Sequence, residues 1–289
     1  MKSISLNSVL ALMKYKVSIA VTFTAITGYI VYAGSLDLRL MLLALGVFVL
    51  AGGSSALNEF QESKYDAVME RTRQRPIPSG AISPRQALMI SILVIISGLF
   101  SLYAFFGIIP FLLGLFNIVW YNLIYTNLKR ITPFAVVPGA LVGAVPAFIG
   151  WTAAGGSVFC PTIIFIGFFL FIWQIPHFWL LMLKYGKEYE VAGFPTINEA
   201  ITPANLKRII FSWIIATSFA SGLIPLFLTN MSRTFFFAVF VLNILFVGIF
   251  TRLSFEKSVD LNLKKSFISM NVYMLLVMIM LIAYHIVVS

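Results

Sequence analysis

Nine long apolar stretches dominate this sequence, and each is long enough to cross a lipid bilayer as a helix. A spanning helix needs about 20 largely apolar residues, and its backbone polar groups are bonded within the helix itself. Hydrophobic residues make up 60% of the chain and charged residues only 10%, with a mean hydropathy of +0.98. These values exclude an ordinary soluble domain. The expected spans are about 17–35, 39–60, 84–106, 108–127, 133–152, 161–183, 208–229, 234–251 and 268–288.

The sequence therefore predicts an all-α polytopic membrane protein with nine transmembrane helices in a single domain, 1–289. The two longest predicted cytoplasmic connections, about 61–83 and 184–207, each follow the second helix of a set of four. This arrangement predicts an internal duplication with one helix appended. The predicted units are two four-helix repeats, 17–127 and 133–251, and a ninth helix at 268–288.

The basic residues predict how the chain is oriented in the membrane. Of the 20 Lys and Arg residues, 18 fall on one side of the spans, and Arg39 and Arg233 alone fall on the other. Lys and Arg concentrate in cytoplasmic loops, so we expect the N-terminus inside and the C-terminus outside a plasma (inner) membrane. The net charge of +10 thus reflects topology, and nucleic acid is not an expected partner. The single cysteine, Cys160, excludes a disulfide framework.

The segment after the second span carries a polar stripe with one member at every fourth position. On a helix that continues from the span, these side chains share one face. Stacked carboxylates repel one another unless a cation lies between them. Mg²⁺ fits best, because it takes oxygen ligands from one or two carboxylates and from substrate phosphates. The members of the stripe are Asn58, Glu62, Asp66 and Glu70.

Three arginines, Arg71, Arg73 and Arg75, follow the stripe at alternate positions. Guanidinium groups form paired hydrogen bonds with phosphate oxygens. Together the stripe and the arginines predict a diphosphate site. The alternative is a solvated helix end at a cytoplasmic mouth, where charges occur in any membrane protein, but such loops do not sort their charges by sign.

Further candidates lie in and after later spans. Gln174 and His177 are polar side chains at membrane depth, which is costly and therefore indicates function. Alternatively, His177 bonds the backbone carbonyl that Pro176 leaves free. Glu188, just beyond the sixth span, is a second-half counterpart of the stripe, and His285 near the outer end of the ninth span is a poorer candidate.

The end of the fourth span adds an aromatic residue and two cations to the predicted cytoplasmic side, namely Tyr125, Lys129 and Arg130. We interpret them as further substrate-binding residues. The alternative is a positive-inside anchor with an aromatic belt.

These motifs together resemble the UbiA superfamily of intramembrane prenyltransferases, and in particular its heme-modifying branch. The likeness runs along most of the chain. The stripe marks the superfamily, whereas the Met-Glu-Arg-Thr run and the Trp-Gln-x-Pro-His-Phe-Trp segment mark the heme branch. The motifs are Asn58-x3-acid-x3-Asp66-x3-Glu70-Arg71-Thr-x-x-Arg75-Pro76, Tyr125-Thr-x-x-Lys129-Arg130, Gly139 to Trp151 with Pro146 and Gly150, and Trp173-Gln-x-Pro-His-Phe-Trp179.

The resemblance implies nine helices around a central cavity, with two acidic motifs that hold an isoprenyl diphosphate through Mg²⁺. It implies transfer of a farnesyl group from farnesyl diphosphate to the vinyl group of heme B, with water adding to the product. Membrane lipid and terminal oxidase or heme A biosynthesis proteins are the implied partners. The implied metal ligands are Asn58, Glu62, Asp66 and Glu188, and the implied substrate-binding residues are Arg71, Arg75, Tyr125, Lys129, Arg130, Gln174 and His177.

The chain departs from the family pattern at two positions. Lys64 stands where the first acidic motif usually has an aspartate, but it lies about 200° round the helix from Glu62 and so points away from the stripe. Lys187 replaces one aspartate of the second motif and leaves Glu188 as its carboxylate. The family pattern keeps Arg71 and Arg75, so we expect Arg73 to face away from the diphosphate.

Three other functions remain open at this level. Another UbiA-type enzyme, acting on an aromatic acid or a chlorophyll-like ring, would share the stripe but not the His177 segment. A transporter could also use two four-helix repeats with polar residues at mid-membrane. The lysines at 64 and 187 would suit a membrane assembly factor whose catalytic site has decayed.

Overall fold

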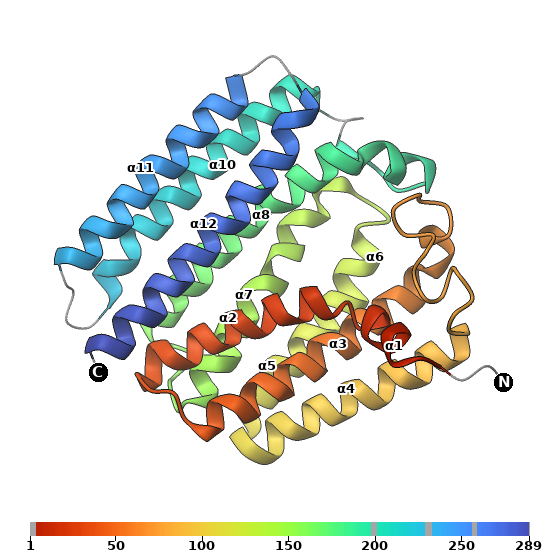
Figure 1. Cartoon of the computed structure of the whole chain (residues 1–289), viewed down its shortest axis with the longest axis horizontal. Coiled ribbons are helices and arrows are strands. Elements are labelled where there is room, and N and C mark those ends of the chain that lie inside the picture. The colour runs from red at the N-terminus through yellow and green to blue at the C-terminus, as the bar shows by residue number, and fades with distance from the viewer. Residues whose placement is uncertain (1–3, 198–200, 229–232, 256–258, 289) are drawn as a thin grey trace.

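The structure, a computed structural model, describes residues 4–197, 201–228, 233–255 and 259–288. All regular elements within these residues are helices (Figure 1). Nine spans within these residues are long and apolar enough to cross a membrane, as the sequence predicts. The first three spans are α2 (Tyr15–Ala33), α3 (Leu38–Asp66) and α4 (Pro84–Phe106), preceded by a short helix α1 (Leu6–Leu12). The fourth combines α5 (Ile108–Ile118), the π-helix η1 (Val119–Tyr125) and α6 (Thr126–Leu128). The others are η2 (Pro133–Ala135) with α7 (Val136–Ala153), α8 (Pro161–Val191), α10 (Pro203–Leu223) with η3 (Ile224–Phe227), α11 (Arg233–Phe255) and α12 (Val259–Val288).

Several helices extend beyond their apolar stretches. The helix α3 continues to Asp66, as the polar stripe requires, but α8 also continues to Val191, well past the predicted end of its span at 183. The connection predicted at 184–207 is therefore helical over its first part. Hydropathy marks where a helix leaves the membrane, whereas helical hydrogen bonds continue into water as long as the residues allow it.

The spans form a bundle that is closed by the last helix. The helix α2 packs against α3 and α7, α7 packs against α8, and α12 contacts both α2 and α8. Figure 1 places α1 and the connection after α3 at one end of the bundle, and the C-terminus at the opposite end. Opposite ends for the two termini agree with nine crossings. The internal duplication stays a prediction, because helix bounds and contacts do not test it.

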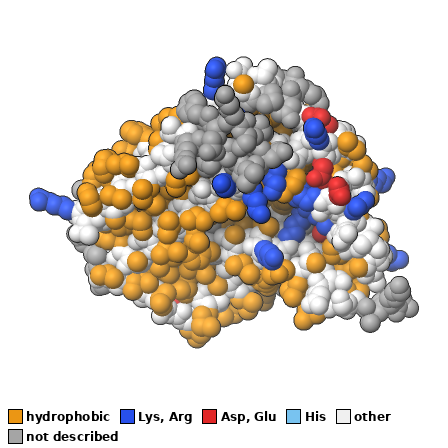
Figure 2. Space-filling model, turned by 45° about the horizontal axis from the view of Figure 1, so that its top comes forward, with side chains coloured by type: hydrophobic (Ala, Val, Ile, Leu, Met, Phe, Trp, Pro, Cys, Tyr) orange, Lys and Arg blue, Asp and Glu red, His pale blue; other side chains and the backbone are white. Residues whose placement is uncertain are grey.

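The surface separates apolar from charged side chains. Figure 2 shows hydrophobic side chains over a broad lateral face, while most charged side chains in view gather towards one side. Large apolar side chains such as Leu93, Phe100 and Phe237 are two-thirds exposed. Together with the nine apolar spans, such a surface indicates contact with lipid. The chain is thus a multi-pass integral membrane protein.

Two glycines allow α2 and α7 to approach very closely. A Cβ atom added to Gly28 would lie 2.0 Å from the carbonyl oxygen of Ala147, and one added to Gly150 would lie 1.8 Å from that of Ala25. Both partners are backbone atoms, which cannot rotate away. Small residues at such crossings are the usual means of packing helices within a membrane.

We expect Gly150→Ala to lower the free energy of unfolding by at least about 2 kcal/mol, because the added methyl group forces two backbones apart. The measurement is thermal unfolding in detergent. Gly248→Ala on α11 is the matched control, since no atom lies within 4 Å of its added Cβ. Equal melting temperatures for the two variants would contradict the close crossing.

Candidate active site

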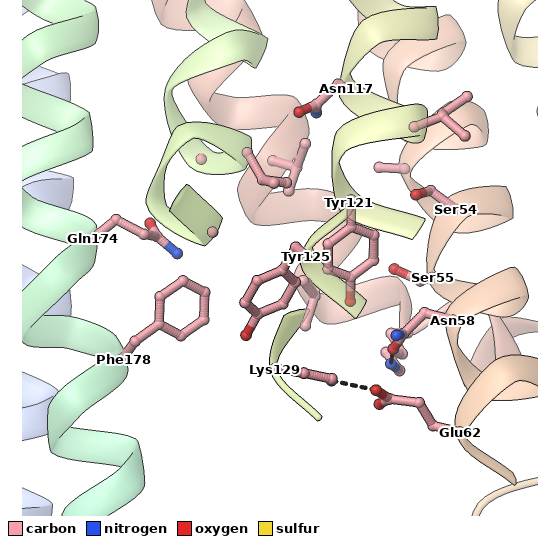
Figure 3. A pocket seen from close by; sticks show the side chains of 18 of the residues that line it. Ser54, Ser55, Asn58, Glu62, Asn117, Tyr121, Tyr125, Lys129, Gln174 and Phe178 are labelled. Carbon is pink, nitrogen blue, oxygen red and sulfur yellow. Dashed lines mark hydrogen bonds and ion pairs between the residues drawn. The ribbon is translucent and has the colours of Figure 1, made fainter. Parts of the chain in front are cut away.

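A cavity of about 380 Å³ lies between α2, α3, the fourth span, α7 and α8. Its size is within the range of about 300–1,000 Å³ that is usual for small-molecule sites. Figure 3 shows Gln174 and Phe178 of α8 facing Tyr121 and Tyr125 of η1, with Asn58 and Glu62 of α3 beyond them. Much of the remaining wall is apolar. Its apolar residues include Val17, Val21, Val47, Leu50, Ile118, Val142 and Ile149.

The predicted polar stripe lies on the cavity wall over three of its four members. Asn58, Glu62 and Asp66 all line the cavity, and they are 1%, 5% and 0% exposed. Because these groups are buried, they are not the charges of a solvated helix end.

The prediction is wrong for Glu70. The hydroxyl of Thr72 donates to the carbonyl oxygen of Asp66 at 2.9 Å, so the last turn of α3 is capped there and the chain leaves the helix. The side chain of Glu70 is 83% exposed, and it pairs with Arg73 at 3.8 Å.

Each polar group of the stripe contacts a cation. Glu62 forms an ion pair with Lys129, and Asp66 accepts a hydrogen bond from Arg75 at 2.7 Å. The ammonium of Lys14 donates to Asn58 Oδ1 at 2.9 Å. Burying a carboxylate without a partner costs several kcal/mol, so these cations allow the stripe to be buried at all.

The pKa values of the cations reflect this pairing. Burial opposes the charged form of Lys129, but Glu62 together with the neighbouring Tyr125 and Tyr189 raises the pKa of that ammonium. Burial likewise opposes the charge on Arg75, and Asp66 raises its pKa. The pKa of Lys14 is instead lowered to about 8, by burial first and by the neighbouring Arg75 second. The charge of Lys14 is therefore the least well compensated of the three.

The stripe has the donor set for a hard divalent cation. The oxygen Asp66 Oδ1 is buried and has no hydrogen-bond partner among the described residues, so it is available to a ligand. Among the residues that the structure describes, no group of three His, Cys, Asp or Glu side chains could hold a metal ion. Two carboxylates and an amide suit Mg²⁺, which takes its other ligands from phosphate and water.

The structure does not bring Glu188 to this cluster. Its carboxylate accepts a hydrogen bond from the backbone nitrogen of Arg71 at 3.0 Å, and its side chain is absent from the cavity wall as described. Glu188 thus ties the end of α8 to the connection after α3. Its predicted role as a metal ligand has no support from this geometry.

The three arginines lie in two different environments, as the sequence predicts. Arg71 and Arg75 line the cavity, and the guanidinium of Arg71 lies over the ring of Tyr185, 4.8 Å from its centre. Arg73 is outside the cavity wall, with its side chain 59% exposed beside Glu70.

Adjacent residues at the end of the fourth span have different positions. Tyr125 and Lys129 line the cavity. Arg130 does not, which corrects its predicted role in substrate binding. Its guanidinium donates to the carbonyl oxygen of Gln61 at 2.8 Å and lies over the ring of Tyr65, so it holds the fourth span against α3.

On the opposite wall, α8 presents Gln174 and His177 to the cavity. The atom His177 Nδ1 is buried and has no hydrogen-bond partner among the described residues, so it does not bond the carbonyl left free by Pro176. In contrast, His285 lies away from the cavity wall, with Nδ1 2.8 Å from the carbonyl oxygen of Leu281.

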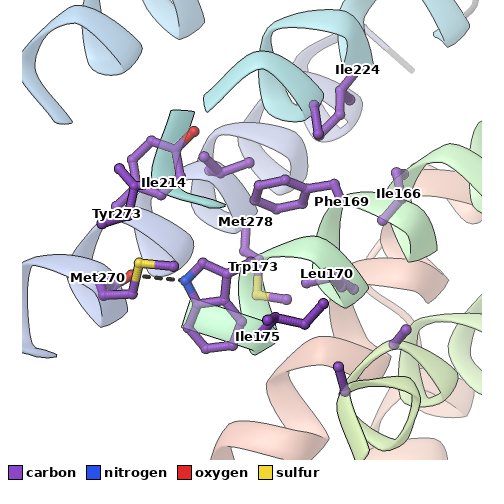
Figure 4. Packing of buried hydrophobic residues seen from close by; sticks show 14 of the residues in the cluster. Ile166, Phe169, Leu170, Trp173, Ile175, Ile214, Ile224, Met270, Tyr273 and Met278 are labelled. Carbon is purple, nitrogen blue, oxygen red and sulfur yellow. Dashed lines mark hydrogen bonds between the residues drawn. The ribbon is translucent and has the colours of Figure 1, made fainter. Parts of the chain in front are cut away.

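The position of His177 is held from behind by an apolar cluster between α8, α10 and α12. Trp173, one turn earlier, donates from Nε1 to the carbonyl oxygen of Met270 at 3.0 Å (Figure 4). The imidazole of His177 then packs between the rings of Trp173 and Phe267, at 4.8 and 4.9 Å between centres.

Sequence reasoning missed the π-helix η1 and the residues that hold it. Gln61 donates to the carbonyl oxygen of Asn122 at 3.0 Å, and Asn122 donates to that of Ser54 at the same distance. These bonds fix η1 against α3 and leave Tyr121 and Tyr125 stacked on the cavity side, 5.8 Å between ring centres. A polar residue such as Asn122 within a span was the available signal.

Solved structures with the same fold include a digeranylgeranylglyceryl phosphate synthase, with a TM-score of 0.78, 17% identity, and coverage of 97% of this chain and 98% of that one. A UbiA homolog from Archaeoglobus fulgidus, bound to GPP and Mg²⁺, matches with a TM-score of 0.71 and 16% identity over 96% of this chain and 99% of that one.

Curated relatives are closer in sequence. The chain is 36% identical to a protoheme IX farnesyltransferase of Geobacter sulfurreducens, over 75% of this chain and 80% of the relative. It is 35% identical to the protein of that name from Bartonella henselae, over 91% of this chain and 85% of the relative. The sequence profile of the UbiA prenyltransferase family matches residues 20–284, which is nearly the whole bundle. The profile match, the curated relatives and the shared fold together show that the chain belongs to the UbiA prenyltransferase family.

Proposed function

We propose that this protein is a protoheme IX farnesyltransferase, or heme O synthase. It transfers the farnesyl group of farnesyl diphosphate to a vinyl group of heme B. A water molecule adds to the adjacent vinyl carbon and loses a proton, and the products are heme O and diphosphate. The observation that carries the proposal is the buried face of Asn58, Glu62 and Asp66, which meets Arg71 and Arg75 at one end of an apolar cavity. The names of the curated relatives support heme B as the acceptor.

The diphosphate end of the substrate binds at this face. The residues that would hold Mg²⁺ are Asn58, Glu62 and Asp66, and a related structure that holds both GPP and Mg²⁺ supports this cofactor. When bound, the ion neutralises part of the charge on the diphosphate. Arg71 and Arg75 bind further phosphate oxygens, which lowers the barrier as the carbon–oxygen bond breaks and its electron pair passes to the diphosphate.

The apolar wall receives the farnesyl chain and limits access of bulk water, which would quench an allylic cation. Tyr121 and Tyr125 present their rings between the diphosphate end and the α8 wall. An aromatic face stabilises positive charge that develops nearby. The protein itself supplies no nucleophile, because the vinyl group of the acceptor attacks the farnesyl carbon.

The heme acceptor binds against α8. His177 contributes a buried ring nitrogen without a hydrogen-bond partner among the described residues, and neutral imidazole is a common ligand of heme iron. We assign to His177 the role of orienting heme B, by ligation or by contact with the macrocycle, and to Gln174 a polar contact beside it.

The protein resides in the plasma (inner) membrane with its diphosphate site on the cytoplasmic side, in keeping with the distribution of Lys and Arg. Terminal oxidase or heme A biosynthesis proteins receive the product. Incubation of the purified protein with heme B, farnesyl diphosphate and Mg²⁺, followed by mass spectrometry, tests the proposed reaction. Formation of heme O supports it, whereas a prenylated aromatic acid and no heme O would favour another UbiA-type reaction.

We expect Asp66→Asn to reduce turnover by at least about 100-fold, on the scale of losing a key electrostatic contact. The substitution keeps the shape of the side chain but removes its charge. Steady-state heme O formation at saturating Mg²⁺ gives the measurement, with thermal unfolding as a check on the fold. The control is Glu70→Gln, an exposed carboxylate four residues later that should leave turnover within about twofold. Normal turnover in Asp66→Asn would show that Asp66 is not a ligand of the metal.

Arg71→Ala and Arg75→Ala should each raise the KM for farnesyl diphosphate by about tenfold or more, since each removes a charge-assisted hydrogen bond to phosphate. Arg73→Ala, in the same connection but outside the cavity wall, should leave KM unchanged. Initial rates against farnesyl diphosphate concentration distinguish the three variants. An effect confined to heme affinity would contradict the assignment of Arg71 and Arg75.

His177→Ala should lose or shift the Soret band that develops when heme B is titrated into the protein, while binding of farnesyl diphosphate stays intact. Absorption spectroscopy measures this directly. His285→Ala, which removes the other histidine of the chain, is the control and should titrate like the unmodified protein. An unchanged spectrum and affinity in His177→Ala would leave His177 with a packing role alone.

A further inference from the structure

Two cations of the cavity wall, Lys14 and Lys129, have no role in the proposed reaction, and of these Lys14 alone has no carboxylate partner among the described residues. Lys14 lines the cavity, and its ammonium donates to Asn58 Oδ1 at 2.9 Å. Lys129 and Arg75 are paired with carboxylates, whereas Lys14 bonds a neutral amide. An ammonium group has three donors. Lys14 therefore has both charge and donors to offer to an anion in this cavity.

The backbone directs this side chain inward. Lys14 lies between α1 and α2 with φ 46° and ψ 51°, and it is the one non-glycine residue with positive φ in the described part of the chain. An L-residue enters this left-handed region only where its surroundings hold it there. Leu12, fully buried in a cluster with Ala56 and Ile82, anchors the turn on one side. The hydroxyl of Ser18, bonded to the carbonyl oxygen of Met13 at 2.9 Å, anchors it on the other.

This arrangement is unusual for a lysine at the edge of a membrane. Such side chains commonly extend to the interface and keep the charge in water. The next lysine, Lys16, is exposed on the first turn of α2. The left-handed turn thus places Lys14 in the cavity wall and Lys16, two positions later, on the surface.

The charges around the cavity favour an anion with more than one negative charge. Among the described residues of its wall, four are cations and two are carboxylates, so the wall carries a positive excess. The carboxylates Glu62 and Asp66 are each balanced by a partner. The excess lies with Lys14 and with Arg71, whose guanidinium contacts an aromatic ring.

We propose that Lys14 binds the diphosphate directly, and that its ammonium exchanges Asn58 Oδ1 for a phosphate oxygen when magnesium diphosphate enters. This inference rests on the proposed function. An ammonium and Mg²⁺ repel each other when both are close to one amide oxygen, and a phosphate group between them removes this repulsion. The exchange also frees Asn58 Oδ1 for the metal. Lys14 is then a substrate-binding residue contributed by the turn between α1 and α2, in addition to the arginines of the connection after α3.

The test is binding of inorganic pyrophosphate in the presence of Mg²⁺ to the purified protein in detergent, measured by isothermal titration calorimetry. Lys14→Met keeps an unbranched side chain, one atom shorter and without the charge, and it should weaken binding by about tenfold or more. Lys14→Arg keeps the charge and should stay within about threefold of the unmodified protein. Lys16→Met is the matched control and should bind normally, because its side chain is exposed.

Binding by Lys14→Met that equals or exceeds that of the unmodified protein would overturn the inference. Tighter binding would mean that Lys14 only competes with the metal for Asn58. Thermal unfolding accompanies each titration. If Lys14→Met does not fold, Lys14→Gln replaces it with the same expected loss, since glutamine can still donate to Asn58 but carries no charge. Failure of the unmodified protein to bind magnesium pyrophosphate would instead contradict the diphosphate site and hence the proposed function.

Discussion

The site depends on burying two carboxylates at the end of a transmembrane helix. Glu62 and Asp66 are almost fully removed from solvent, and burying a carboxylate is costly unless it is paired with a cation. The cations come from different parts of the chain: Lys129 follows the fourth span, and Arg75 belongs to the connection after α3. Ion pairing therefore draws these segments together against α3 and shapes the wall of the cavity.

The same pairs prepare the site for an anionic substrate. A group of buried cations without partners would repel one another and destabilise the fold, whereas here the carboxylates hold them in place. In the function proposed above, a bound metal ion would pair with the carboxylates and the phosphate oxygens with the cations, so that the buried charges keep partners.

The apolar stretches were sufficient to predict the nine spans, and the four-residue spacing of Asn58, Glu62 and Asp66 directly predicted a shared helical face. This spacing failed at Glu70, since the bond from Thr72 that ends α3 depends on how the chain folds back. Lys129 and Arg130 illustrate the same limit, as adjacent cations whose directions depend on the neighbouring helix.

Lys14 was missed for another reason. In the sequence it is one of many basic residues that set topology, and the left-handed turn that directs it inward leaves no signal in hydropathy. Glu188 shows the converse error, because a carboxylate in the expected place was assigned to the metal while its actual partner is a backbone nitrogen of the opposite connection. Local pattern predicts the face of a helix, but tertiary contacts decide the partner.

The π-helix within the fourth span has a consequence for the evolution of this wall. A π-helical turn contains about one residue more than an α-helical turn, so it acts as an insertion that the helix absorbs without a loop. The residues of α6 and the lysine after it are therefore rotated relative to α5, compared with a straight α-helix. A deletion of one residue between Val119 and Tyr125 would restore the regular helix and leave Lys129 directed towards Glu62, whereas an α-helix of the present length would turn Lys129 away. The π turn is thus a place where the fourth span can gain or lose one residue without losing this buried ion pair.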